Sequence, residues 1–514
     1  MAEARPRVRV KAGSNRLAPR ADLAVDVLQP FRAPAPRTVR WIGNVSGPNA
    51  VQDYSLSTLR GKSREEVRKN GLADAGVDVL VSNIVGSGIK PQFTTSSPEF
   101  NRELADLWLQ WTDESDADGR LDFYGQQALA VRSMVEGGDS FGRLRARRLG
   151  DLETVPLQVQ LLEAEYCPET NNRPGVLPAD GRAGVNPIRS GVEFDIIGRR
   201  TAYHLTREHP FDGVLLGKVT NYDTVAVPAS EVVHLACIRR PGMVRGEPWL
   251  TRALAKLHDL DEYDDAQLVR QKISALFAGF VRTDPAEGDD TADLFAGQTE
   301  AYDDGVALAS LEPGTMQVLE QGQSVEWSEP PSPGNNYVEF VREQKRAIAA
   351  SLGQMYEQLS GDYSQVNDRT FRASVNEFRR RCAMWQHHVV VFQFCRPILR
   401  RWIELGVLSG KIRLPQGVTV AQAARAKWVP EGWAYINPTQ DIQAKREEIR
   451  AGLRSRSEVV SSAGYDVEQV DAEQASDASR ADRLGLVYDS DPRKTAGSGA
   501  VQADAEPDPA PPAN

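Results

Sequence analysis

Residues 248–280 have the sequence PWLTRALAKLHDLDEYDDAQLVRQKISALFAGF, in which proline occurs only at the first position. Leucines recur at spacings close to three and four residues, as on the buried face of an α-helix: Leu250, Leu254, Leu257, Leu260 and Leu268. At about 1.5 Å per residue such a helix would extend roughly 50 Å, more than most single domains need. The stretch therefore predicts one unusually long helix.

Two more long helices are expected downstream. Apolar residues at helical spacing predict an amphipathic helix over residues 335–356. After an interruption at residues 361–369, a third helix is expected over residues 370–405, with a kink at Pro397.

The segment between the first two helices has a different character. Residues 283–305 are rich in Gly and Asp and indicate an exposed loop or a small lobe. Residues 316–319 and 324–327 are predicted to form a β-hairpin, and residues 330–334, PPSPG, a linker.

The N-terminal half mixes helices and strands. Helical periodicity predicts helices at residues 63–85, 98–111 and 123–136. Apolar or alternating runs bounded by turn residues predict strands at 139–148, 157–162, 191–195, 201–206 and 231–237. The expected fold class is α+β.

The two ends of the chain are compositionally biased. Residues 1–40 hold nine Lys or Arg and no apolar signal-peptide region, which indicates a basic mobile arm. Near the other end, helices are expected at residues 440–453 and after the cap at Ser455. Residues 496–514 contain four Pro, three acids and no base, and are expected to be disordered.

Size and charge exclude several classes of protein. At 514 residues the chain exceeds what one hydrophobic core supports, so several units are expected. The net charge of −10 argues against a protein that coats nucleic acid through released counterions. No run of apolar residues is long enough to span a membrane. Cys167, Cys237, Cys382 and Cys395 lack metal-type spacing and are expected to be small buried side chains.

The sequence GDSFG, residues 138–142, matches the G-x-S-x-G pattern of serine hydrolases. That motif needs a strand before the serine and a helix after it, whereas here the order is reversed. A Gly-rich helix-to-strand turn is therefore expected, and a hydrolase acting through Ser140 remains an alternative.

Three other patterns are even weaker evidence for a binding site. Leu56 stands where a phosphate-binding loop ending at residues 61–63 would need glycine. Residues 114–119, ESDADG, imitate a calcium loop, but its twelfth position is Gly125, so an Asp-rich turn between helices is expected. His387 and His388 have no other ligands that complete a metal site. Neither a metal nor a cofactor is predicted.

Charge is patterned on two of the long helices. The first carries an acidic run at the cost of like-charge repulsion: Asp259, Asp261, Glu262, Asp264 and Asp265. The third carries many arginines, among them Arg372, Arg379, Arg380 and Arg381. The acids could form a solvated face; the two helices together indicate mutual neutralisation, within or between subunits, more than DNA binding.

The order of motifs resembles the portal proteins of lambda-type tailed phages over about residues 38–475. The most specific run is RPGMVRGEPWL at 240–250. The others are SREEVRKN at 63–70, NIVGSGI at 83–89, DFYG at 122–125, EGGD at 136–139, GVEFD at 191–195, LDEYDDA at 260–266, LEPG at 311–314, IAASLG at 348–353 and FRR at 378–380. Residues 367–372, NDRTFR, depart from the Tyr-Ser-Ser-type stretch usual there.

The resemblance implies a portal fold assembled as a ring of about twelve copies around a channel. Such a ring occupies one capsid vertex of the virion after assembly in the host bacterial cytoplasm. It passes double-stranded DNA without sequence preference during packaging and ejection. Its other partners are the terminase large subunit, the head–tail adaptor, and the major capsid and scaffold proteins. A DNA-binding capsid scaffold is the remaining non-enzymatic alternative.

The resemblance also divides the chain into the parts of a portal subunit. They are an N-terminal arm at 1–40, a mixed α/β wing at 41–246, a first stem helix at 247–280, a clip at 281–333, a second stem helix at 334–357, a tunnel loop at 358–369, a long helix to the wing at 370–405, a helical crown with wing at 406–490 and a tail at 491–514.

Three groups of site residues follow from this division. The acidic run is expected to face the channel or a subunit seam, where it would repel DNA and let it slide. The arginines Arg372, Arg379, Arg380 and Arg381 are expected at an intersubunit contact. The tunnel-loop residues are Ser360, Gly361, Asp362, Tyr363, Asn367 and Arg369.

Overall fold

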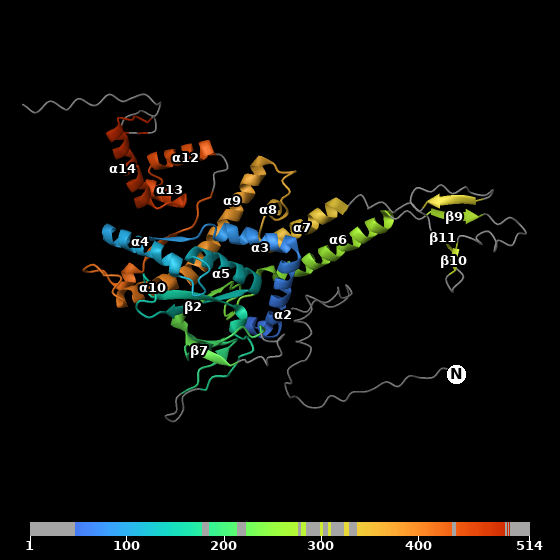
Figure 1. The fold of residues 1–514 in the computed structure, drawn as a ribbon, viewed down its shortest axis with the longest axis horizontal. Coiled ribbons are helices and arrows are strands. Elements are labelled where there is room, and N and C mark those ends of the chain that lie inside the picture. Colours follow the sequence, from blue (N-terminus) through green and yellow to red (C-terminus); the bar gives the residue numbers. More distant parts are fainter. Residues whose placement is uncertain are drawn as a thin grey trace, which may run out of the picture. The chain divides into compact units, whose positions relative to one another are not determined.

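The computed structural model describes residues 47–176, 184–212, 223–275, 279–283, 299–301, 307–309, 323–327, 337–433 and 438–488, together with Asp491 and Arg493 (Figure 1). The chain divides into two units, one made of residues 1–257 and 346–514 and the other of residues 258–345. Helices and sheets are both present, which confirms the predicted α+β class.

The first unit begins with helices and then alternates into strands. The elements up to the first long helix are α2 (Pro48–Lys69), α3 (Gly71–Ile84), β1 (Lys90–Phe93), α4 (Pro98–Glu114), α5 (Phe123–Gly137), β2 (Asp139–Ala146), β3 (Leu157–Glu163), β4 (Ile188–Arg189), β5 (Val192–Phe194), β6 (Arg200–Thr206), β7 (Thr224–Pro228) and β8 (Val232–Ala236).

Its strands form three antiparallel sheets. One has the order β3-β2-β8, so β2 is paired on both sides, and Phe141 of β2 lies opposite Leu162 and His234. A second is the four-stranded meander β4-β5-β6-β7. The third pairs β1 with β13 (Ala426–Val429). Strands β1, β4, β7 and β13 were not predicted from the sequence, because each is five residues or shorter and shows no clear alternation.

An aromatic cluster forms the centre of this unit. The ring of Trp108 on α4 lies 5.2 Å from that of Phe123 on α5 and 5.1 Å from that of Trp402, both edge to face. Trp111 also packs on Phe123, at 5.4 Å. All four side chains are at most 2% exposed. Because they come from three distant helices, the cluster ties the N-terminal half of the chain to residues beyond 396.

The helix predicted over residues 63–85 is two helices. The first helix begins earlier, at Pro48, and ends at Lys69. Asn70 has extended backbone angles and separates the two helices. The Asn70 side chain accepts a hydrogen bond from the backbone N–H of Leu72 and so caps α3. A capping side chain favours a new helix start over continuation, which the apolar periodicity alone did not reveal.

The helix predicted over residues 370–405 also differs from expectation. It consists of α9 (Asp368–Trp385), a π-helix (Gln386–Cys395) and α10 (Arg396–Leu408). The sequence predicted only a kink at Pro397; the structure has a ten-residue π-helix that ends two residues before this proline. Proline lacks an N–H and crowds the carbonyl four residues earlier, so a wider hydrogen-bonding pattern before it is physically reasonable.

The second unit contains most of the first long helix. The helix α6 (Leu254–Ala275) follows a 3₁₀ turn at Trp249–Arg252, so its α-helical part begins later than the sequence indicated. The predicted end at residue 280 was wrong as well, because residues 279 and 280 pair as part of a β-strand. The other elements there are β9 (Gly279–Thr283), β10 (Thr299–Ala301), β11 (Ala307–Ala309), β12 (Gln323–Trp327) and the part of α7 (Tyr337–Leu352) up to Lys345. The predicted strand at 324–327 is confirmed, but it pairs with β9; its predicted partner at 316–319 lies outside the described residues.

The C-terminal region is helical, as expected. After α8 (Tyr356–Ser360) and the short α11 (Val420–Ala423) come α12 (Pro438–Arg450), α13 (Arg456–Ser462) and α14 (Val467–Leu484). Ser455 caps α13 by accepting a hydrogen bond from the N–H of Glu458, which confirms that prediction. Both the basic arm at 1–40 and the tail at 496–514 lie outside the described residues.

The cysteines and the apolar character of the helices were both considered from the sequence. The four cysteines are unpaired and buried, as predicted. Among the described helices, none combines the length and the apolar character needed to cross a bilayer.

Gly138 and Gly246 bring two backbone segments into direct contact. A Cβ on Gly138 would lie 2.5 Å from the carbonyl oxygen of Gly246, and a Cβ on Gly246 would overlap the carbonyl oxygen of Gly138. Gly138 also has φ of 88°, a conformation that only glycine adopts without strain. The contact therefore requires glycine on both segments.

We expect Gly246→Ala to lower the melting temperature by roughly 5 °C or more, because the methyl group must push two backbones apart. Circular dichroism during heating measures this. Gly61→Ala is the matched control, since Gly61 lies in α2 with no atom within 4 Å of its Cβ position, and should not lower it. Equal melting temperatures for the Gly246 variant and the wild type would contradict the expectation.

Candidate functional site

The acidic run lies on α6 in the second unit. Asp259, Asp261, Glu262 and Asp265 are exposed, while Asp264 is half-buried. The side chain of Asp264 accepts a hydrogen bond of 3.0 Å from the hydroxyl of Tyr337 on α7. The ring of Tyr263 stacks on that of Tyr337 and packs against Phe340, at 6.0 and 5.0 Å. Four of the five acids are thus available to solvent or to another subunit.

The segment predicted as the tunnel loop is held by its own side chains. Gly361, at φ of 68°, ends α8, and the hydroxyl of Tyr356 donates to Asp362 at 2.9 Å. Asn367 caps α9 by accepting a hydrogen bond from the N–H of Arg369. The half-exposed ring of Tyr363 meets Phe371 edge to face at 6.0 Å.

All six loop residues named from the sequence fall on this segment. Ser360 is the last residue of α8, and Arg369 is in the first turn of α9. The connection between the two helices is therefore shorter than residues 358–369.

Three of the four arginines predicted at an intersubunit contact interact within the chain. Arg372 pairs with Asp368 at 3.0 Å and Arg381 with Glu377 at 2.7 Å, each one helical turn away. Arg381 also donates to the carbonyl oxygen of Gly353. The guanidinium of Arg379 lies 5.3 Å from the centre of the Trp433 ring. Arg380 is exposed.

A buried charge centre, which sequence reasoning missed, surrounds Asp139 at the start of β2. Its carboxylate is fully buried and accepts hydrogen bonds from Arg245 at 2.7 Å and from Arg60 at 3.1 Å. His234 on β8 lies 3.0 Å from its other oxygen, which also accepts the backbone N–H of Gly246 at 2.6 Å. A single carboxylate thus joins α2, β2, β8 and the segment that leads to α6.

The arginines of this centre are fully satisfied. Arg245 is 0% exposed and donates further hydrogen bonds to three backbone carbonyl oxygens, those of Ala164, Cys167 and Ser190. Arg60 also donates to the carbonyl oxygen of Gly137 and pairs with Glu169 at 3.2 Å. Buried guanidiniums are tolerated only with such complete pairing. Asp139 and Arg245 both stand in runs that carry the family resemblance, which was the only sequence signal for the centre.

Burial and charge act in opposite directions on the pKa values here. Burial alone would raise the pKa of Asp139, but Arg245, His234 and Arg60 outweigh it and hold that pKa well below its usual range. Burial lowers the pKa of His234 in spite of the neighbouring carboxylate. His234 is therefore neutral at pH 7, and two arginines face Asp139 and Glu169.

The predicted GDSFG turn from helix to strand is confirmed, because α5 ends at Gly137 and β2 begins at Asp139, which places Ser140 at the start of the strand. Ser140 is 2% exposed on a strand paired on both sides. A nucleophilic serine needs its hydroxyl accessible to a substrate, and Ser140 does not meet that need. The Asp-rich turn is confirmed as well: the carboxylate of Asp116 accepts the N–H groups of Asp118, Arg120 and Leu121.

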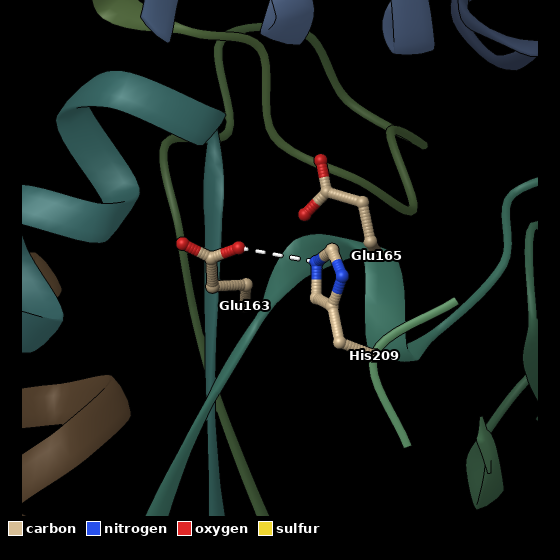
Figure 2. A group of neighbouring side chains, drawn as sticks. All are labelled: Glu163, Glu165 and His209. Carbon is tan, nitrogen blue, oxygen red and sulfur yellow. Dashed lines mark ion pairs between the residues drawn. The ribbon is translucent and has the colours of Figure 1, made fainter. Parts of the chain in front are cut away.

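One further group has donor atoms close enough to bridge a metal ion, and the sequence did not indicate it. Oxygen atoms of Glu163 and Glu165 and a ring nitrogen of His209 lie within 4.8 Å of one another (Figure 2). Nε2 of His209 is 3.3 Å from Glu163.

The guanidinium of Arg64 already engages these carboxylates. It binds both oxygens of Glu165, at 2.7 and 2.9 Å, and lies 3.5 Å from Glu163. A metal ion would have to displace this positive charge. We therefore interpret the group as an ion-pair cluster that joins α2 to the end of β3.

Comparison with known proteins identifies the family. The family described as phage portal protein, lambda family, matches residues 35–386. The probable portal protein of Halomonas phage phiHAP-1 is 24% identical over 466 residues, which cover 87% of this chain and 85% of that protein. The portal protein of Escherichia phage N15 is 23% identical over 492 residues, covering 86% and 89%.

A solved structure, the neck of the native GTA particle computed with C12 symmetry, has a chain that is 13% identical, with a TM-score of 0.44 and coverage of 81% of this chain and 93% of that one. The family match spans most of the chain, so this protein belongs to the lambda family of phage portal proteins, the portal proteins of the phage head–tail connector.

Acid is expected to destabilise the fold in two steps. The unfolded chain binds a proton at His234 below about pH 6.5, whereas the native state, with its lowered pKa, does not. Stability should therefore decline as the pH falls below about 6.5. Below about pH 4 a second loss follows, because protonation of Asp139 is also more favourable in the unfolded chain. Melting temperatures measured across this range test both steps.

The first step can be assigned with two histidine variants. His234→Gln removes the titrating group but retains an amide that can donate to Asp139, so the decline between about pH 6.5 and 5 should become shallower. The exposed His388→Gln is the matched control and should keep the wild-type slope. Identical slopes in the His234 variant and the wild type would show that this residue does not drive the acid response.

Proposed function

We propose that this portal protein assembles into a closed ring of about twelve copies around an axial channel for double-stranded DNA. The family match over residues 35–386 is the observation that carries the proposal. In such a ring each subunit presents one face to a different face of its neighbour, and the rotation closes after a fixed number of copies. The ring occupies one vertex of the capsid in the virion.

The division of the chain follows from the same proposal. The described part of residues 41–246 forms the wing, α6 and α7 form the stem helices, and residues 358–369 form the tunnel loop. Residues 281–333 form the clip, where the terminase large subunit docks during packaging and the head–tail adaptor binds afterwards. Most of the clip lies outside the described residues, which include β9 to β12. The remaining partners are the major capsid and scaffold proteins.

The role is structural and conductive, with no catalysis by this chain. Leu56 stands where a phosphate-binding loop requires glycine, which agrees with an ATPase for packaging that resides in a partner. A net charge of −10 suits a conduit, because DNA carries one negative charge per about 1.7 Å and a strongly basic lining would retain it.

Electron microscopy of the purified protein, with native mass spectrometry to count subunits, tests the ring. We expect closed rings of about twelve copies with a central hole. A stable monomer or dimer at micromolar concentration, also after co-expression with the capsid and scaffold proteins, would contradict the proposal.

Charge reversal tests the role of the acidic run. We expect Asp261→Lys with Asp265→Lys to reduce the yield of DNA-filled heads by about tenfold, since the channel or seam would then attract DNA or repel the neighbouring subunit. Glu99→Lys with Glu103→Lys is the matched control, because these acids are also exposed and one turn apart, on α4. Unchanged yield in the α6 variant, or an equal loss in the control, would refute a specific role for the acidic run.

A further inference from the structure

A pocket of about 580 Å³ opens between α10, α11 and β13 in the first unit. Its distinctive lining residues are three arginines, one acid and one aromatic residue: Arg396, Arg400, Arg425, Glu404 and Trp428. Small alanines and Val420 complete the wall. Nothing in the proposed function assigns a ligand to this pocket.

The walls of the pocket are fixed by the fold. Trp428 stands on β13, opposite Pro91 of β1, and its ring packs edge to face on the buried Trp108 at 6.2 Å. The short α11 begins with a reciprocal capping box between Thr419 and Gln422. The pocket therefore does not depend on a mobile loop for its shape.

The pocket carries excess positive charge. Arg396, Arg400 and Arg425 are exposed, and no carboxylate of the described residues forms an ion pair with any of them. The one acid in the lining, Glu404, pairs with Arg401 at 3.2 Å. In a chain of net charge −10, three arginines without acidic partners around one tryptophan call for an anionic ligand.

The size of the pocket and the spacing of its arginines favour a short acidic peptide over DNA. A volume of about 580 Å³ is typical of pockets that enclose small ligands or a few side chains, and a DNA duplex is too wide to enter it. Arg396 and Arg400 are four residues apart on α10, about 6 Å along the helix axis. Acids two residues apart in an extended peptide are separated by about 6.5 Å, which matches this spacing.

The chain itself contains such a peptide. Residues 504–509 have the sequence DAEPDP, in which Asp504, Glu506 and Asp508 alternate with alanine and proline. Proline-containing segments bind aromatic surfaces with little loss of conformational entropy, and Trp428 offers one. Ten residues lie between Arg493, the last described residue, and Asp504, and these eleven residue steps can span up to about 36 Å.

We propose that the C-terminal segment at residues 504–509 binds in this pocket, with its acids on Arg396, Arg400 and Arg425 and a proline against Trp428. The covalent connection raises the local concentration of the segment to about the millimolar range, so weak surface ion pairs suffice to hold it. An occupied pocket also masks an anion-binding site on a protein that DNA must pass without being retained.

Site-specific photo-crosslinking in the full-length protein tests this. With p-benzoylphenylalanine in place of Ala505, we expect irradiation to join the tail to residues between 396 and 428, as identified by mass spectrometry. Arg400→Glu with Arg425→Glu should reduce the crosslink about fivefold, as should raising the salt concentration well above physiological. Arg413→Glu is the matched control: Arg413 is exposed in the connection between α10 and α11 but does not line the pocket.

A charge exchange makes the test independent of folding defects. Combining the two arginine reversals with Asp504→Lys and Glu506→Lys should restore the crosslink. Failure of the wild-type tail to crosslink within 396–428, or an equal loss in the Arg413 variant, would overturn the proposal. Retention of a labelled DNA duplex by the wild type, abolished by the Arg400 and Arg425 reversals, would instead assign the pocket to phosphate. Ring formation, scored separately, does not depend on either outcome.

Discussion

The carboxylate of Asp139 is the interaction on which the rest of the first unit depends. It is buried completely, and burial of an isolated charge is strongly unfavourable, so the fold must bring Arg60, Arg245 and the backbone N–H of Gly246 to it. These partners come from α2 and from the segment before α6. The α2 helix, the central sheet and the start of α6 are thereby held in one relative arrangement, and any other arrangement would leave charges without partners.

The base of the long helices is positioned from this centre. Arg245 and Gly246 precede the 3₁₀ turn that opens α6, and the close contact of Gly246 with Gly138 fixes the direction of the chain there. Three residues later Trp249 donates its ring N–H to the carbonyl oxygen of Leu352, at the end of α7. The buried network thus lies directly before α6, and Trp249 joins the turn that opens α6 to the end of α7.

The charges that stabilise the fold and the charges on the surface belong to different groups of residues. The charges around Asp139 are paired in the interior and define the fold, whereas four of the five acids in the α6 run are exposed, where ion pairs within the chain contribute little. The arginines of α9 are partly neutralised by acids one turn away. Surface charge of this kind costs little in the isolated subunit and, under the proposed function, is available to DNA or to a neighbouring subunit.

The sequence by itself determined the fold class, the long helices and the family. Periodicity over twenty or more residues needs no tertiary information, which is why α6, α7 and the helical stretch from 368 to 408 were predicted, and ordered motifs such as RPGMVRGEPWL identified the portal family. Boundaries set by single side chains were not predicted: Asn70 divides two helices through one capping hydrogen bond, and the residues before Pro397 widen into a π-helix.

Only the tertiary structure could reveal sites whose members are far apart in the chain. Asp139 and Arg245 are separated by more than one hundred residues, and Trp428 reaches the arginines of α10 only because β13 pairs with β1. Local sequence patterns record which residues share a helix face or a strand face. Contacts across the core depend instead on how those faces pack, because burial and charge pairing are properties of the whole fold.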